Sequence, residues 1–279
     1  MNPRRTRPRG NLAGLLIAVV LVVSHTARAQ KAPDLPRLAA TYVRGFVEQL
    51  SNVVAQEDFE FRKPAQTVRS ELLLVRYPGS RRQFLTFRDV TMVNGQPRTG
   101  RKERLSDLFE QGFEDAQERA LQIAADSAPH VPAVLNPLYA IGLLQTSYQS
   151  RFRFGEKDAG KEWPRTVKGL TFVETARPTL IQSGPFANQN VPTRGTAWID
   201  TVTGRVLQTD LEVRDGRDVT KIVTRFAPDK RLGVMVPIEM RTEKPDATAR
   251  YTNFRRFEVK TEERLQDPVT REVGAGQKE

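Results

Sequence analysis

Residues 231–240 read Arg-Leu-Gly-Val-Met-Val-Pro-Ile-Glu-Met (RLGVMVPIEM), the cleanest two-residue alternation in the chain. Every second residue of this run is apolar: Leu232, Val234, Val236, Ile238 and Met240. A period of two is typical of a β-strand with one buried face. Pro237 has no N–H for a strand ladder, so it predicts either an edge position or a bulge at this point.

Comparable alternation continues through most of the chain from Arg151 onward, interrupted by turn residues such as Thr203-Gly204 and Asp215-Gly216. Closely spaced strands with short turns predict an antiparallel meander. Upstream, residues 69–77 (RSELLLVRY) and 83–93 (QFLTFRDVTMV) are predicted as neighbouring antiparallel strands. The second of them ends at Asn94-Gly95, which is a strong hairpin signal.

Two regions are predicted to be helical. Residues 34–57 place apolar side chains every three or four positions, which is typical of an amphipathic helix, and Asp34 is its expected N-cap. Residues 101–150 are rich in helix formers and prolines, which predicts a helical insertion between the strand blocks.

These patterns predict an α+β fold with a strongly curved antiparallel sheet, or half-barrel. The N-terminal helix and the insertion at about 101–150 are expected to cover its concave side. Residues 30–263 are predicted to form this single domain. Residues 264–279 contain few apolar side chains and are predicted to be a flexible tail.

The first 29 residues are predicted to be a secretory signal peptide that is cleaved after Ala29. They contain five arginines and no acidic residue, then a twelve-residue apolar run and Ala27-Arg28-Ala29. As a helix the apolar run spans only about 18 Å, less than the ~30 Å of a bilayer core. An uncleaved signal anchor is the alternative. A periplasmic or secreted protein is expected, with no transmembrane segment in the mature chain.

Composition excludes several classes of function. The 279 residues include 44 basic and 33 acidic side chains, for a net charge of +11, and no cysteine. Without the five arginines of the signal the net charge is +6, so we predict no nucleic-acid partner. The absence of cysteine excludes disulfides, Cys-ligated zinc, iron–sulfur clusters and thiol nucleophiles.

Residues for catalysis are equally scarce. His130, the only histidine after the signal, lies between two prolines, and no G-x-S-x-G elbow accompanies it. The acidic sets Asp210/Glu212 and Glu262/Glu263 do not resemble a calcium loop. We predict no catalytic residue, metal or cofactor. An exported hydrolase that uses two carboxylates stays open, because such a pair meets only in space.

The arginines near predicted strand ends allow two interpretations. Pairs occur at 81–82, at 151 and 153, and at 255–256. They form either a patch for anionic headgroups or an acidic partner, or an ordinary solvated sheet face. The second interpretation is favoured.

Apolar strand residues that share the predicted concave face are the candidate lining of a ligand site. They are Leu72, Leu74, Phe152, Phe154, Leu170, Phe172, Trp198, Leu207, Leu211, Val234 and Val236. The helix and the insertion either fill the concavity as core or act as a lid over an apolar ligand. The sequence leaves both possibilities open.

Residues 195–207 (GTAWIDTVTGRVL) resemble a strand-turn-strand of the outer-membrane lipoprotein carrier and receptor proteins, LolA and LolB. In that family the hairpin has the pattern W-I-D-x-x-T-G, and the order of elements is similar to the order predicted here. The resemblance implies a half-open antiparallel barrel whose mouth is covered by helices and which binds acyl chains. It assigns no lipoprotein-contacting residue in this sequence.

The predicted function is therefore that of an exported periplasmic binding protein without catalytic activity. It is expected to hold a lipid or a lipoprotein acyl chain under its helices. One alternative is an interaction or sensor module of the same fold that binds another envelope protein. The carboxylate-based hydrolase is the other.

Overall fold

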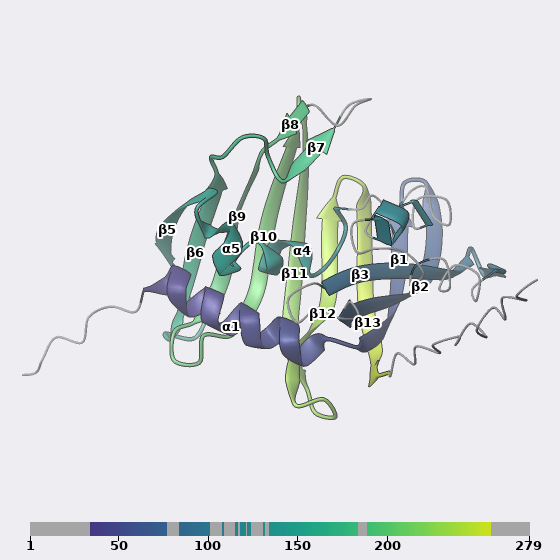
Figure 1. Cartoon of the computed structure of the whole chain (residues 1–279), viewed down its shortest axis with the longest axis horizontal. Coiled ribbons are helices and arrows are strands. Elements are labelled where there is room, and N and C mark those ends of the chain that lie inside the picture. Colours follow the sequence, from purple (N-terminus) through teal and green to yellow (C-terminus); the bar gives the residue numbers. More distant parts are fainter. Residues whose placement is uncertain are drawn as a thin grey trace, which may run out of the picture. The chain divides into compact units, whose positions relative to one another are not determined.

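The strands predicted by alternation pair into one open, antiparallel sheet in the computed structural model (Figure 1). The structure describes residues 34–76, 84–100, 134–183 and 189–257, with 108, 115, 116, 118–120, 122, 123 and 131. These residues belong to one compact unit, Pro33–Glu279. The predicted signal peptide, the predicted tail, His130 and the arginines at 81–82 lie outside the described residues.

The described helices are α1 (Leu35–Leu50), α4 (Tyr139–Gly142) and α5 (Thr146–Gln149). The first strands are β1 (Val53–Arg62), β2 (Ala65–Arg76), β3 (Phe84–Val93), β4 (Gln96–Pro97), β5 (Phe152–Asp158) and β6 (Val167–Glu174). A separate hairpin consists of β7 (Ile181–Ser183) and β8 (Gln189–Val191). The remaining strands are β9 (Thr193–Asp200), β10 (Val206–Asp215), β11 (Asp218–Asp229), β12 (Val234–Glu243) and β13 (Asp246–Arg256).

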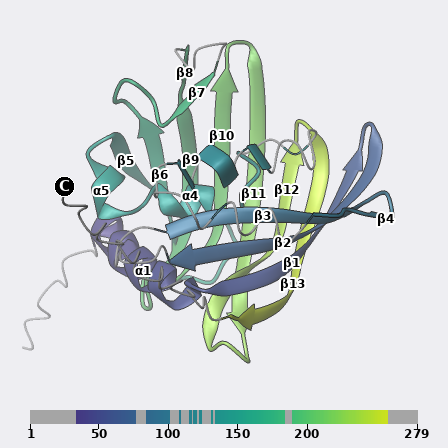
Figure 2. The same ribbon diagram turned by 45° about the vertical axis from the view of Figure 1, so that its right-hand side comes forward.

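The sheet joins two meanders at a seam. Its order is β4-β3-β2-β1-β13-β12-β11-β10-β9-β6-β5, so β1 pairs with the last described strand, β13. At this seam Phe59 lies opposite Ala249. Strands β1, β2 and β3 run crosswise to β10 and β11, so the sheet is strongly curved (Figures 1 and 2).

The N-terminal helix is shorter than predicted. Asp34 caps α1 as expected, because its side chain accepts a hydrogen bond from the Arg37 N–H at 3.3 Å. The helix ends at Leu50, however, and the prediction that it continues to residue 57 was wrong. Asn52 has a positive φ of 58° and turns the chain into β1. The adjacent valines that begin β1 fit both a helical and a strand period, which explains the error.

Two predictions from local sequence are confirmed, one of a turn and one of a bulge. Asn94 and Gly95 both have positive φ, 49° and 77°, and they join β3 to the short β4. Pro237 lies at a bulge of an interior strand: Arg225 pairs with Glu239 and Phe226 with Pro237, so Ile238 is left over. The β12–β13 ladder begins only at Glu239, so the missing Pro237 N–H breaks no bond there.

The two faces of the sheet can be assigned from the register. One row of successive cross-strand partners consists of Leu170, Ala197, Thr209, Thr224, Met240, Ala249, Phe59 and Val68. All of these side chains are buried. We call the face that carries this row the inner face, because α1 and α4 pack against it, and the opposite face the outer face.

The prediction that the insertion covers the concave side of the sheet is only partly correct. Leu108, Ala116, Ala120 and Ile123 form a separate apolar cluster with side chains of β1, β2 and β3 on the outer face. Only the later part of the insertion, with Leu135, Ile141 and Leu144, packs on the inner face. The run Leu72-Leu73-Leu74-Val75 explains this arrangement, since its apolar side chains alternate between the two faces.

Candidate functional site

A helical cover closes the apolar inner face. The buried stripe of α1 consists of Leu35, Ala39, Val43, Phe46 and Leu50. Residues 134–149, which include α4 and α5, complete the cover and bring in the fully buried Leu135, Ile141 and Leu144. We call α1 and residues 134–149 the cover. Figure 2 shows α1 and α4 on the same side of the sheet.

Most of the predicted lining residues meet beneath this cover. Ten of the eleven belong to the inner core or pack against it: Leu72, Leu74, Phe152, Phe154, Leu170, Phe172, Leu207, Leu211, Val234 and Val236. They come from five strands, β2, β5, β6, β10 and β12, and they form one continuous apolar surface.

Trp198 is the exception, and its prediction as an inner-face residue was wrong. Its neighbours Ala197 and Ile199 face the inner core, so Trp198 lies on the outer face. There its indole N–H donates to Asp210 at 2.7 Å, and its ring stacks on Trp163 with centroids 5.6 Å apart. Both alternating sets of side chains in β9 contain apolar residues, so alternation alone does not show which set faces the inner core. The prediction chose the set with the larger side chain, Trp198, and the structure places the other set on the inner face.

The described part of the inner face is closely packed beneath the end of α1. An apolar cavity between α1, β1, β2 and Leu138 has a volume of only about 20 Å³. That is little more than the roughly 10–15 Å³ that one water molecule needs. An acyl chain therefore does not fit into this cavity unless the cover moves.

A buried ion pair lies within this apolar surface. Glu57 of β1 is 0% exposed and Arg88 of β3 is 7% exposed. The guanidinium donates to the carboxylate twice, from Nε at 2.5 Å and from Nη2 at 3.0 Å. Ser70 adds a third hydrogen bond to Glu57 at 2.8 Å, and the Phe59 ring lies 5.3 Å from the guanidinium carbon.

This ion pair also reaches the cover. Arg88 Nη2 donates to the backbone carbonyl of Leu135 at 2.5 Å. Tyr251 is the cross-strand partner of Glu57, and burial, followed by the negative charge of Glu57, raises the pKa of its phenol well above the usual value. A charge buried in this way is costly unless it is fully hydrogen-bonded. The position of Leu135 is therefore coupled to the ion pair.

Sequence analysis missed this ion pair, although a signal was present. Glu57 lies on the same face of β1 as Val53, Ala55, Phe59 and Phe61. All four of these apolar residues belong to the inner core. A charged residue at a core position indicates a buried partner. The signal was hidden because residue 57 had been assigned to the end of a helix.

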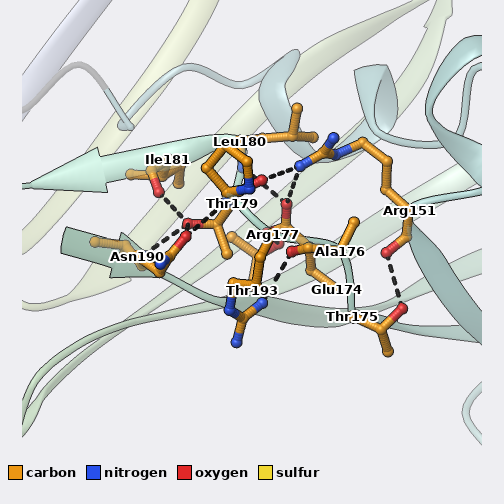
Figure 3. Close-up of polar contacts among 12 residues, drawn as sticks. Arg151, Glu174, Thr175, Ala176, Arg177, Thr179, Leu180, Ile181, Asn190 and Thr193 are labelled. Carbon is orange, nitrogen blue, oxygen red and sulfur yellow. Dashed lines mark hydrogen bonds and ion pairs between the residues drawn. The ribbon is translucent and has the colours of Figure 1, made fainter. Parts of the chain in front are cut away.

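A second buried carboxylate, Glu174 at the end of β6, fastens the β7–β8 hairpin (Figure 3). It is 3% exposed and accepts hydrogen bonds from the Leu180 N–H at 2.7 Å and the Thr193 hydroxyl at 3.1 Å. Arg151 lies 3.8 Å from it and donates to the Pro178 carbonyl.

Thr179 extends the Glu174 cluster to both strands of the hairpin (Figure 3). Its hydroxyl donates to the Ile181 carbonyl at 2.5 Å and accepts from the Val191 N–H at 2.9 Å. Its backbone N–H donates to Asn190 at 2.7 Å. These bonds hold Leu180 and Ile181 against the inner core, so the cluster has a structural role.

The chemistry of these buried groups is that of anchoring. Glu57 and Glu174 accept hydrogen bonds from buried donor groups, and the two residues lie in separate clusters. Among the described residues, no three His, Asp or Glu side chains are grouped so that they could hold a metal ion. The described part of the chain also contains no helix with the length and hydropathy to cross a membrane.

Three arginines of the outer face pair with carboxylates on other strands of the sheet. Arg69 lies 2.6 Å from Asp58, and Arg250 lies 3.0 Å from Glu60. Arg255 lies 2.5 Å from Glu71. These pairs agree with the interpretation of a solvated sheet face.

Comparisons with known proteins complete the description. No protein-family model and no curated protein matches the chain. Among solved structures, the chain is similar to a domain of Vibrio parahaemolyticus assigned as an outer membrane lipoprotein-sorting protein. The identity is 14%, the TM-score is 0.38, and the match covers 81% of this chain and 94% of that one. We therefore argue function from the contacts of the chain itself.

Proposed function

We propose that this protein is an exported, non-enzymatic binding protein of the cell envelope that carries an acyl chain of a lipid or lipoprotein. The chain would lie on the inner face in place of the buried stripe of α1, with α1 shifted outward beside it. One observation carries this proposal: an apolar inner face that spans the sheet is closed by separate helices. Such helices can move away without breaking a strand ladder.

The polar bonds that hold the cover in place are few among the described residues. Arg88 of the sheet donates to the Leu135 carbonyl, and within the cover Gln149 of α5 donates to the Pro36 carbonyl of α1 at 2.7 Å. Packing of apolar side chains supplies the rest of the attachment. Both bonds end on backbone carbonyls, which solvent can satisfy when the cover lifts.

The energy of such an exchange is balanced. Each methylene that leaves water contributes ~0.8 kcal/mol, so a twelve-carbon chain gains about 10 kcal/mol. Exposing Leu35, Val43, Phe46 and Leu50 of α1 costs roughly 1.5–3 kcal/mol each, or about 6–12 kcal/mol together. An acyl chain can therefore replace α1 at little net cost, as a reversible carrier requires.

Disulfide trapping tests this proposal, because the chain has no native cysteine. A Cβ built on Gly204 would lie 3.2 Å from Cδ1 of Leu38 in α1, so Leu38→Cys with Gly204→Cys can join α1 to the β9–β10 turn. Laurate binding should be lost in the oxidised double variant and return on reduction. The reduced double variant is the control, because it carries the same strain of a Cys at the positive φ of Gly204.

Unchanged laurate binding in the oxidised form would contradict a moving cover. Lipid that co-purifies with the wild-type protein, detected by native mass spectrometry, would support the carrier function directly.

The close packing of the inner face favours one second candidate, a filled-core module that binds another envelope protein. In that case neither laurate nor a longer fatty acid should bind, and native mass spectra should show no lipid. A partner recovered from envelope extract by a lipid-free protein would then identify the function.

A further inference from the structure

A second and larger cavity opens beside α1. Its volume is about 300 Å³, at the lower end of the range for small-molecule sites, ~300–1,000 Å³. It lies between α1 and the turns that join β9 to β10 and β11 to β12. Its lining consists of Thr41, Tyr42, Gly45, Phe46, Gln49, Thr203, Arg205, Pro228, Gly233, Val234 and Met235.

The lining is amphipathic. Phe46, Val234 and Met235 are buried members of the inner core, so the cavity adjoins the proposed acyl-binding surface. Phe46 also makes an edge-to-face contact with Phe226, with ring centroids 6.0 Å apart. Thr41 and Gln49 supply polar groups from the exposed side of α1.

Among the described residues that line this cavity, Arg205 carries the only formal charge. Its side chain is exposed and makes no hydrogen bond or ion pair within the described ranges. The carboxylate of Asp200 attracts Arg205 electrostatically, but its hydrogen bonds come from the Val202 N–H at 3.1 Å and the Thr203 hydroxyl at 2.8 Å. Among the described residues, the guanidinium therefore keeps its own hydrogen-bond donors for an anion.

Tyr42 adds a hydrogen-bonding group beside Arg205. Its hydroxyl oxygen is buried and finds no partner among the described residues. Tyr42 and Arg205 line the same cavity. Burial raises the pKa of this phenol, and the positive charge of Arg205 opposes the rise. A buried hydroxyl without a partner is unfavourable, and an oxygen atom of a ligand would satisfy it.

The β9–β10 turn holds this site against α1. Gly204 has a positive φ of 74°, and a Cβ there would meet Leu38 of α1 at 3.2 Å. The turn thus brings Arg205 to the side of α1 that carries Tyr42. When α1 moves, the headgroup site and the acyl surface must change together.

We propose that this cavity binds the anionic headgroup, a carboxylate or a phosphate, of the amphiphile whose acyl chain enters beneath α1. The proposal rests on the proposed function and narrows its ligand to anionic amphiphiles. Arg205 binds the anion by charge-assisted hydrogen bonds, and Tyr42 donates a further one. The apolar floor at Phe46 and Met235 leads from the headgroup toward the chain.

Four ligands with the same twelve-carbon chain test the proposal: laurate, dodecyl phosphate, dodecanol and dodecyltrimethylammonium. Binding is measured by titration calorimetry below the micellar concentration. We expect wild-type protein to bind the two anions about tenfold or more tightly than dodecanol, since hydrogen bonds to charged groups contribute that much. The ammonium compound should bind most weakly. A preference between laurate and dodecyl phosphate identifies the headgroup.

Variants assign the preference to the cavity. Arg205→Gln should reduce binding of both anions to the level of dodecanol, whereas Arg205→Lys should retain most of it. Tyr42→Phe should weaken anion binding about threefold to tenfold and leave dodecanol unchanged. Arg217→Gln removes the same charge from the exposed β10–β11 turn and should have no effect.

The outcomes separate the two proposals. Equal binding of dodecanol and the anions, unaffected by Arg205→Gln, would overturn the headgroup site and leave the acyl carrier standing. No binding of any of the four ligands would overturn the carrier function itself. An equal loss in Arg205→Gln and Arg217→Gln would indicate attraction by net charge and would also overturn the site.

Discussion

Removing the guanidinium of Arg88 should destabilise the protein strongly. Its side chain is 6% exposed, and that of Glu57 is 0% exposed. In Arg88→Met the carboxylate loses both guanidinium hydrogen bonds, and the Leu135 carbonyl loses its partner. Breaking a buried pair in this way costs about 3–5 kcal/mol. For a domain of this size the loss corresponds to a fall in Tm of roughly 6–20 °C.

The assay is a double-mutant cycle, with the free energy of unfolding measured by urea denaturation. Glu57→Gln should be destabilising for the same reason, because it leaves a buried guanidinium. The double variant Arg88→Met/Glu57→Gln has no buried charge and should be more stable than the sum of the single effects predicts, by at least 2 kcal/mol. Arg255→Met, which breaks an exposed pair with Glu71, should cost only about 0–1 kcal/mol.

Two results would refute this reasoning. One is additivity of the two single effects within about 0.5 kcal/mol, which would mean that the two side chains are not coupled. The other is a cost of Arg88→Met as small as that of Arg255→Met, which would mean that Glu57 is solvated.

Three further predictions concern the buried tyrosines, the close approach at Gly195 and the outer-face position of Trp198. Burial raises the pKa of three of the five tyrosines, namely Tyr42, Tyr139 and Tyr251. A raised phenol pKa stabilises the fold fully below the unfolded value near 10, and this stability is lost as the pH rises toward the folded value. Tyrosinate absorbance should therefore show these three phenols ionising only together with alkaline unfolding, and their independent titration would contradict their burial. Gly195→Ala should cost about 1–3 kcal/mol in urea denaturation, since a Cβ there would overlap the backbone carbonyl oxygen of Asp210 and lie 2.5 Å from the Phe172 ring. Gly142→Ala, where the nearest atom is 3.7 Å away, is the control and should be close to neutral. Trp198→Phe should leave laurate affinity unchanged, because this side chain is on the outer face; a large loss would place the acyl chain there instead.

Local sequence patterns predicted several parts of the sheet well. The run 231–240 predicted a strand with a bulge, and Asn94-Gly95 predicted a hairpin turn between β3 and β4. The structure confirms the strand, the bulge and the hairpin. These features depend on neighbours a few residues away. Sequence patterns are most informative at that distance.

Features that depend on distant partners were not predicted. Glu57 and Arg88 are 31 residues apart, and nothing local indicates that they meet. The outer-face cluster was missed because the apolar run 72–75 was interpreted as a strand with one buried face. Trp198 was placed on the wrong face because its large apolar side chain competes with the smaller Ala197 for the inner parity.

The seam between β1 and β13 has a consequence for the order of folding. Arg250 and Glu60, which pair across it, are separated by 190 residues. Closing a loop of that length costs about 5 kcal/mol of chain entropy before the contact is made. Each meander can form from near neighbours, but the two halves can join only after the last strand is available. Slow, late closure is typical of sheets with such distant pairing. Until the C-terminal strand docks, the edges of β1 and β12 remain open to aggregation, so truncation just before β13 should harm solubility more than truncation after it.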